Sequence, residues 1–105
     1  MPSQYLYCIK PTRDGFLIKS TPEEDAIVSE HFDHLKELTE QGIVWMAGRT
    51  LNTDETSHGI VIFVAPSQEQ AKAIISGDPA VKAGVFGAEL FPFSVTLASE
   101  AILPD

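Results

Sequence analysis

Two histidines three residues apart, His31 and His34, are the side chains whose chemistry first needs an explanation. At about 100° per residue, His31 falls inside the apolar stripe of the helical pattern around it, whereas His34 lies near its edge. An imidazole that faces a core must find a hydrogen-bond partner, or a polar group is stranded at a cost of roughly 1–3 kcal/mol. His31 is therefore either a satisfied core histidine or part of a site.

Other kinds of reactive site find less support in the sequence. His31 and His34 could place two metal ligands on one helix face, but no convincing third ligand accompanies them, so we expect no metal. A single cysteine, Cys8, excludes an intramolecular disulfide and a CxxC metal site. No Gly-rich phosphate loop is present, so we expect no nucleotide and no other cofactor. No activated nucleophile can be identified, which favours isomerisation or elimination over acyl-enzyme chemistry.

The helix that must position His31 is the longest helical pattern in the chain, from Thr21 to Gly42. Thr21, with Glu24 three residues later, forms a capping box, and Gly42 suits the left-handed residue that ends a helix. The expected buried stripe has three- and four-residue spacing and contains Ile27, Val28, Phe32, Leu35 and Leu38.

The remaining segments predict strands over residues 4–10, 43–47, 59–65 and 85–97. We expect the second to be buried and the third to be buried on both faces, whereas Pro92 indicates a bulge or an edge position in the fourth. A second helix begins after Ser67 with a Ser67-x-x-Gln70 capping box, and Asp78 and Pro79 begin a further short turn. The apolar segment 16–19 could pack over a pocket mouth or merely extend a loop.

The resulting β-α-β-β-α-β order predicts an α+β, ferredoxin-like sandwich with both helices on one sheet face. The strands carry apolar residues on both faces, with Tyr5 and Tyr7 on one side of the first strand and Leu6 and Cys8 on the other. The second face therefore needs a cover, and a second copy of the chain is the simplest candidate. We expect a homodimer.

Composition limits the class of protein further. A length of 105 residues with 44% hydrophobic residues predicts one domain over 1–105, with its core at about 4–98. Fifteen acidic and seven basic residues give a formal charge of −8, which disfavours nucleic acids and membranes as partners. The N-terminus lacks signal-peptide features and no apolar run is long enough to span a bilayer, so we expect a cytoplasmic protein.

Four segments in order, HFDHLKELTEQG with IVWMAG, GDPAVKAGVF and ELFPFSV, resemble the YciI-like (YCII-related) family from about residue 5 to 97. His31 matches the family histidine and His34 does not, while Asp78 and Pro79 match the family Asp-Pro segment. The sequence departs from the pattern at three positions. Arg49 stands where proline is common, Ala80 where an aromatic is common and Val28 where arginine is frequent.

The resemblance implies a dimeric α/β-barrel type assembly in which His31 and Asp78 approach each other beside a pocket as a catalytic dyad. Related sequences include chloromuconolactone dehalogenases, which act on small lactone acids. A carboxylate on one imidazole nitrogen would leave the other free for proton transfer. Asp78 also suits a helix cap, and the two roles are compatible.

Arg49 could hold a substrate carboxylate, or it could form a surface ion pair in this acidic protein. Two functions follow from these residues. One is a small enzyme performing acid–base chemistry (isomerisation, elimination or hydrolysis) on an unknown small molecule that carries a carbonyl or carboxylate. The alternative is a non-catalytic dimeric module that binds a metabolite or a partner, because the fold hosts both kinds of role.

Overall fold

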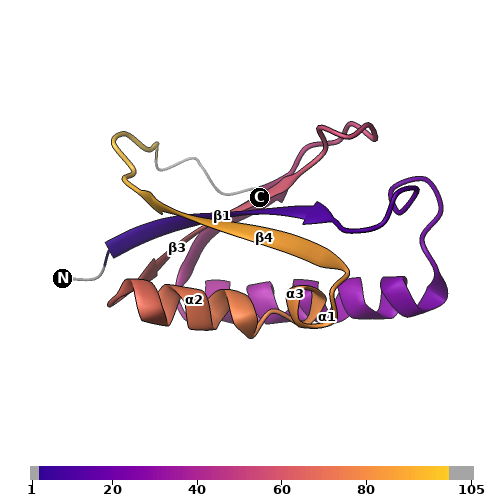
Figure 1. Cartoon of the computed structure of the whole chain (residues 1–105). Helices are drawn as coiled ribbons and strands as arrows, with labels where there is room; N and C mark the ends of the chain where they lie inside the picture. Colours follow the sequence, from indigo (N-terminus) through magenta and orange to yellow (C-terminus); the bar gives the residue numbers. More distant parts are fainter. Residues whose placement is uncertain (1–2, 100–105) are drawn as a thin grey trace.

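In the computed structural model, which describes residues 3–99, three helices lie on one face of a four-stranded antiparallel sheet (Figure 1). The elements in chain order are β1 (Ser3–Pro11), α1 (Pro22–Glu40), β2 (Val44–Arg49), β3 (Gly59–Ala65), α2 (Gln68–Ser76), α3 (Pro79–Lys82) and β4 (Phe86–Phe93). The sheet order β2-β3-β1-β4 confirms the expected α+β arrangement. No helix in this part of the chain is long and apolar enough to cross a membrane.

Helix α1 begins and ends where the sequence predicts. The Thr21 side chain accepts from the Glu24 N–H, and the Glu24 carboxylate accepts from the Thr21 N–H, so the capping box is complete. At the other end, Gly42 adopts a φ of 79°, the left-handed conformation that glycine takes without strain. The Ser67 cap of α2 is also present, since its side chain accepts from the Gln70 N–H.

The predicted stripe of α1 needs one correction. His31 and Leu35 are its buried residues, whereas Phe32 is 63% exposed. Phe32 is exposed because it borders an open pocket and does not pack under the sheet.

The two outer strands also differ from expectation. We expected residues 43–47 to form a buried strand, but β2 is an edge strand in which Val44 alone is buried and Trp45 is 42% exposed. A register shift interrupts its pairing with β3 between Val44 and Met46. Strand β4 ends at Phe93, four residues before the expected end at residue 97. Pro92 lies on this edge strand opposite Tyr5, where a missing N–H costs no pairing within the sheet.

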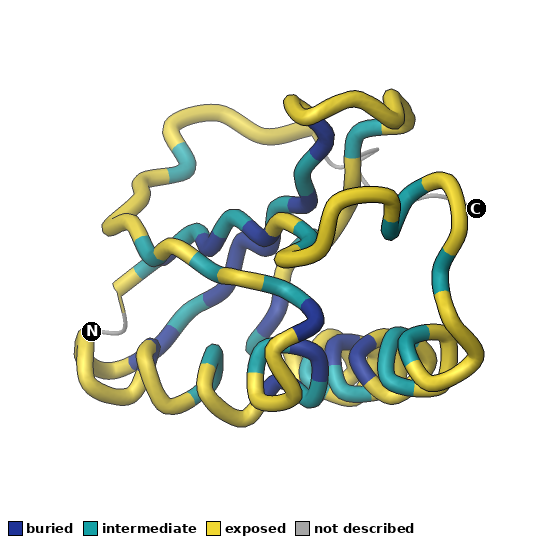
Figure 2. Tube along the Cα trace, turned by 45° about the vertical axis from the view of Figure 1, so that its right-hand side comes forward, coloured by how far each residue is buried: buried dark blue, intermediate teal, exposed yellow. Residues whose placement is uncertain are grey.

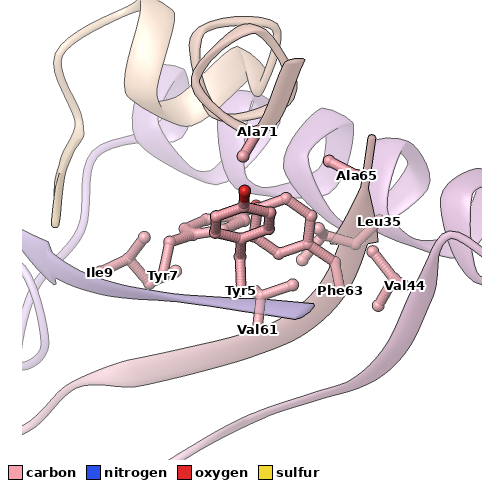
Figure 3. Packing of buried hydrophobic residues seen from close by; sticks show 9 residues of the cluster. All are labelled: Tyr5, Tyr7, Ile9, Leu35, Val44, Val61, Phe63, Ala65 and Ala71. Atoms are coloured by element: carbon pink, nitrogen blue, oxygen red, sulfur yellow. The ribbon is translucent and has the colours of Figure 1, made fainter. Parts of the chain in front are cut away.

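The core lies between the sheet and the helices and is built around aromatic rings from two neighbouring strands (Figure 3). Tyr7 of β1 and Phe63 of β3 are fully buried and meet edge to face, with ring centroids 5.6 Å apart. Leu35 of α1 and Ala71 of α2 pack against the same cluster. Figure 2 shows this dark band of burial between the two layers, with the outer sides of the helices exposed.

The opposite face of the sheet is covered by no helix of the described chain (Figure 1). Leu6 of β1 lies at its centre, paired with Ile62 of β3 on one side and Phe91 of β4 on the other. Phe91 is 46% exposed. We call this face the open sheet face; it presents mainly apolar side chains, with two polar ones among them, and consists of Leu6, Cys8, Met46, Ile60, Ile62, Val64, Phe91, Phe93, Gln4 and Glu89.

Candidate functional site

Helix α1 brings His31 against the start of α3, where its ring meets Asp78. The His31 Nδ1 lies 2.7 Å from Oδ1 and 2.8 Å from Oδ2 of Asp78. Asp78 is fully buried and His31 is 8% exposed. The two residues that the family resemblance pairs are thus in direct contact, and their use in catalysis stays a prediction.

Two further donors surround the same carboxylate. The Tyr7 hydroxyl donates to Oδ2 at 2.9 Å, and the Ala80 N–H donates to Oδ1 at 3.0 Å, which makes Asp78 the cap of α3. Burial raises the pKa of Asp78, but the hydrogen bond and charge of His31, helped by the other two donors, hold that pKa below its usual range. Asp78 is therefore an anion at neutral pH that accepts hydrogen bonds from three different residues.

Tyr7 remains a hydrogen-bond donor in this arrangement. Its burial, followed by the charge and the hydrogen bond of Asp78, raises the pKa of the hydroxyl well above its usual value. The hydroxyl therefore stays protonated, and its proton points to the carboxylate. Tyr7 thus stabilises the ionised form of Asp78 as a neutral hydrogen-bond donor.

The remaining nitrogen of His31 is open to the pocket. Since the anionic carboxylate can only accept a hydrogen bond, Nδ1 carries a proton and donates a hydrogen bond to Asp78. Within residues 3–99, His34 Nε2 is the one buried side-chain nitrogen or oxygen without a partner. His31 Nε2 also makes no hydrogen bond within these residues, but it is not among the buried unpaired atoms. It is therefore accessible from outside the protein. His31 lines a pocket, and Nε2 is the atom that can meet a ligand in it.

This pocket has a volume of about 730 Å³, a size typical of small-molecule sites. It lies between α1, β2, β3 and the loop after β1. The Phe86 ring stands edge-on to the His31 ring, with centroids 5.3 Å apart. The lining is mostly apolar and includes Val28, Phe32, Leu35, Trp45 and Phe86, with His58 and the charged Lys36, Glu40 and Arg49 at a few points. The exposure of Phe32 and Trp45 is explained by this position.

Arg49, the predicted substrate-binding residue, lies at the end of β2 opposite Gly59 and lines the same pocket. Its side chain forms no ion pair or hydrogen bond with residues 3–99, so the surface ion pair considered from the sequence is absent there.

Neither of the other two histidines bonds to this pair, although His58 lines the same pocket. His34 Nε2 is buried without a partner, and the His34 ring lies near Gly77 at the end of α2. His58 donates from Nδ1 to the Thr56 carbonyl oxygen at 2.8 Å. No three His, Cys, Asp or Glu side chains of the described range gather closely enough to hold a metal ion.

Tyr7 was not expected to be a site residue, although the sequence placed it with Tyr5 on one face of the first strand. A buried tyrosine hydroxyl almost always finds a partner, and that rule could have indicated a polar contact at this position. Phe86 was also missed, because nothing in the strand pattern shows which ring will stand against His31.

Comparison with known proteins identifies the family. A model of the YCII-related domain matches residues 4–94. The chain belongs to the YCII-related family. This confirms the resemblance found in the sequence, and it covers all four strands and all three helices.

Two solved structures share the fold at low identity. The 5-chloro-2-hydroxyhydroquinone dehydrochlorinase of Burkholderia phenoliruptrix, in complex with 2,5-dihydroxybenzoquinone, has a TM-score of 0.64 and 18% identity. The match covers 86% of this chain and 93% of the dehydrochlorinase. An uncharacterized protein of Thermotoga maritima has a TM-score of 0.51 and 10% identity, over 90% of this chain and 100% of that one. No curated protein matches the sequence.

Proposed function

We propose that this YCII-related protein is a small enzyme in which His31 and Asp78 perform acid–base chemistry on a small molecule bearing a carbonyl or carboxylate. The observation that carries the proposal is the state of the His31 ring. Its Nδ1 is held by the ionised Asp78 at 2.7 Å, and its Nε2 is open to a pocket of about 730 Å³.

The proposed role of His31 is that of a base that becomes an acid. Nε2 takes a proton from a carbon next to a carbonyl, and the resulting imidazolium is stabilised by the Asp78 carboxylate at Nδ1. The same Nε2–H then returns the proton to the substrate or to a leaving group. Tyr7 and Ala80 keep Asp78 anionic throughout, because both donate to it.

Arg49 is proposed to bind the acidic group of the substrate. A guanidinium binds a carboxylate through two parallel hydrogen bonds, and this one has no partner within residues 3–99. The apolar lining around it suits a ring or a short carbon chain. Among the possible reactions, elimination draws support from the similarity to a dehydrochlorinase, since loss of HCl begins with removal of a proton by a base.

We also propose that the protein is a homodimer, joined through the open sheet face. Leu6, Ile62 and Phe91 form an apolar row across three paired strands, and no helix of the described chain covers them. A two-fold axis would bring this row against its own copy and bury it from water.

A screen followed by kinetics tests the enzymatic proposal. Small carboxylates, lactone acids and chlorinated hydroquinones are first screened for a rise in Tm, and each hit is then assayed for turnover, with chloride release for the chlorinated compounds. His31→Gln and Asp78→Asn should abolish turnover while far-ultraviolet circular dichroism is unchanged. Arg49→Gln should raise KM more than it lowers kcat.

Two outcomes would contradict this function. If His31→Gln retains turnover, the imidazole is not the acting group. If ligands bind with high affinity but no hit is converted, the protein is a binding module, the alternative that the sequence leaves open.

A further inference from the structure

The loop between β1 and α1, residues 12–20, closes one side of the pocket with an aromatic ring. Phe16 and Leu17 both line the pocket. The Phe16 ring stands edge-on to Phe86, with centroids 5.6 Å apart and an interplanar angle of 77°. Phe86 stands edge-on to His31 in the same way. Three rings therefore form a continuous row from the loop to the imidazole, and each pair has a favourable edge-to-face geometry.

A clasp of charged groups holds this loop against α1. Arg13 donates from Nε and Nη2 to the two carboxylate oxygens of Glu24, at 2.9 and 2.7 Å. Its Nη2 also donates to the Lys19 carbonyl oxygen at 2.9 Å. Arg13 and Lys19 stand on either side of Phe16 in the chain, so one guanidinium ties both arms of the loop to the first turn of the helix.

The clasp has a firm anchor. Glu24 is already fixed by the capping box of α1, where it accepts from the Thr21 N–H. The hydrogen bond from Arg13, with that from Thr21, lowers the pKa of Glu24 to about 2, so the pair stays charged at neutral pH. Inside the loop, the Ile18 and Lys19 N–H groups both donate to the Gly15 carbonyl oxygen, which forms a tight turn.

We propose that Phe16 is a specificity-determining residue: it limits the size of the ligand that can approach His31 Nε2, and the Arg13–Glu24 clasp positions it. The inference rests on the proposed function, in which this pocket binds the substrate. The ligand class it predicts is a small, flat molecule, because the Phe86 ring stands against the imidazole and the Phe16 ring stands against Phe86.

The first test measures how exposed His31 is, and it needs no ligand. Diethyl pyrocarbonate acylates unprotonated imidazole nitrogens, and peptide mass spectrometry gives the initial rate at His31, expressed as a ratio to the rate at His31 of the wild type. Phe16→Ala should raise this ratio by about two- to tenfold, the population change expected from the loss of one aromatic pair. Ile18→Ala is the matched control. Ile18 belongs to the same loop but is 82% exposed and does not line this pocket, so the ratio should not change.

A second variant keeps the test decisive if Phe16→Ala does not fold. Arg13→Gln retains Phe16 but breaks the ion pair with Glu24, so it should raise the His31 ratio in the same direction by a smaller factor. An unchanged ratio in a folded Phe16→Ala protein, or in Arg13→Gln where Phe16→Ala fails to fold, would overturn the proposal.

The second test measures size selection with two anionic compounds. Titration calorimetry would compare 2,5-dihydroxybenzoquinone, which has one ring, with 8-anilinonaphthalene-1-sulfonate, which has three. Phe16→Ala should lower the Kd of the larger compound by about tenfold and change that of the smaller by less than about twofold. Equal changes for the two compounds would refute size selection by Phe16.

The two proposals fail in different ways. If His31→Gln retains turnover while Phe16→Ala still increases His31 exposure, the catalytic role of His31 is wrong. The proposed role of Phe16 in limiting access to His31 is then still supported. If turnover depends on His31 but Phe16→Ala changes neither measurement, the enzymatic proposal stands and the role of Phe16 is wrong.

Discussion

At the scale of single residues, the protein concentrates its polar chemistry on one carboxylate. Asp78 is fully buried, yet three residues donate to it, and each comes from a different part of the fold. A buried charge is tolerated only when its partners replace the lost water. Loss of any one donor should therefore lower the free energy of unfolding and change the pKa of Asp78.

Removal of the Tyr7 hydroxyl tests one of these donors. Tyr7→Phe keeps the buried ring but leaves Asp78 one hydrogen bond short, so the free energy of unfolding should fall by about 1–3 kcal/mol. Tyr5→Phe is the matched control, because Tyr5 lies on the same strand face and its hydroxyl bonds to none of residues 3–99. The control should change stability by less than about 0.5 kcal/mol in urea unfolding. Equal losses in the two variants would contradict the role of the hydroxyl.

The ionisation of Asp78 predicts how stability depends on pH. Its pKa is lower in the folded protein than the usual 3.8, so below that pH the unfolded chain binds more protons and stability rises with pH. This contribution is complete above the usual pKa and is lost as the pH falls through the lowered one. Asp78→Asn should therefore be less stable than the wild type at neutral pH and should lose less stability on acidification from about pH 5 to about pH 2.

Urea unfolding across this range measures the effect, with Asp33→Asn as the control. Asp33 is exposed on α1 and bonds to none of the described residues, so its variant should follow the wild-type curve. Parallel curves for wild type and Asp78→Asn would contradict the prediction.

At the scale of elements, helix α1 is the part that the sequence predicts best. Its capping box and its left-handed glycine follow from local rules, and local rules operate here without competition. Strand β2 is predicted less well, because its hydrophobic run resembles a buried strand although it lies at the sheet edge. Periodicity reports which residues are apolar, and it does not report whether the covering layer reaches them.

Gly42, in the turn between α1 and β2, and Gly48, within β2, yield a matched pair of variants. Gly42 has a φ of 79°, and an added Cβ would meet nothing within 4 Å, so Gly42→Ala isolates backbone strain. We expect a loss of about 1–2 kcal/mol in the free energy of unfolding. Gly48 is equally open but lacks the positive φ, so Gly48→Ala should cost less than about 0.5 kcal/mol. A similar cost at both positions would show that the strain at Gly42 is relieved elsewhere.

The candidate site is predictable from the sequence to a similar, limited degree. His31 stands out because an imidazole on an apolar stripe needs a partner, and the family resemblance names Asp78 as that partner. The pocket could not be predicted, because it depends on the angle at which α1 crosses the edge strand. Phe32 and Trp45 were both expected to be buried, but they are exposed because they line this pocket.

At the scale of the whole molecule, the two faces of the sheet differ in whether helices cover them. One is covered by three helices, and the other presents Leu6, Ile62 and Phe91 without a helix over them. An apolar sheet face of this kind is a common interface between two copies of a chain.

Phe91→Glu tests the proposed dimer. The wild type should elute with twice the 11.4 kDa protomer mass in size-exclusion chromatography with light scattering at micromolar concentration. Phe91→Glu should elute at the protomer mass, because it places a charge within an apolar contact. Ala73→Glu, at an exposed position of α2 on the helix side of the sheet, should remain dimeric. A monomeric wild type would contradict the dimer outright.

The junction at Asp78 has a consequence for how this family can change over time. Mutation of Tyr7, His31 or Asp78 lowers the stability of the folded protein, because each leaves a buried group of the others unsatisfied. Selection for stability alone would therefore preserve the three residues in a lineage that had abandoned its reaction. Arg49 is exposed and bonded to none of the described residues, so selection for stability would not preserve it if the proposed ligand were lost. In descendants of this protein that lost the proposed reaction, position 49 would be substituted before Tyr7, His31 or Asp78.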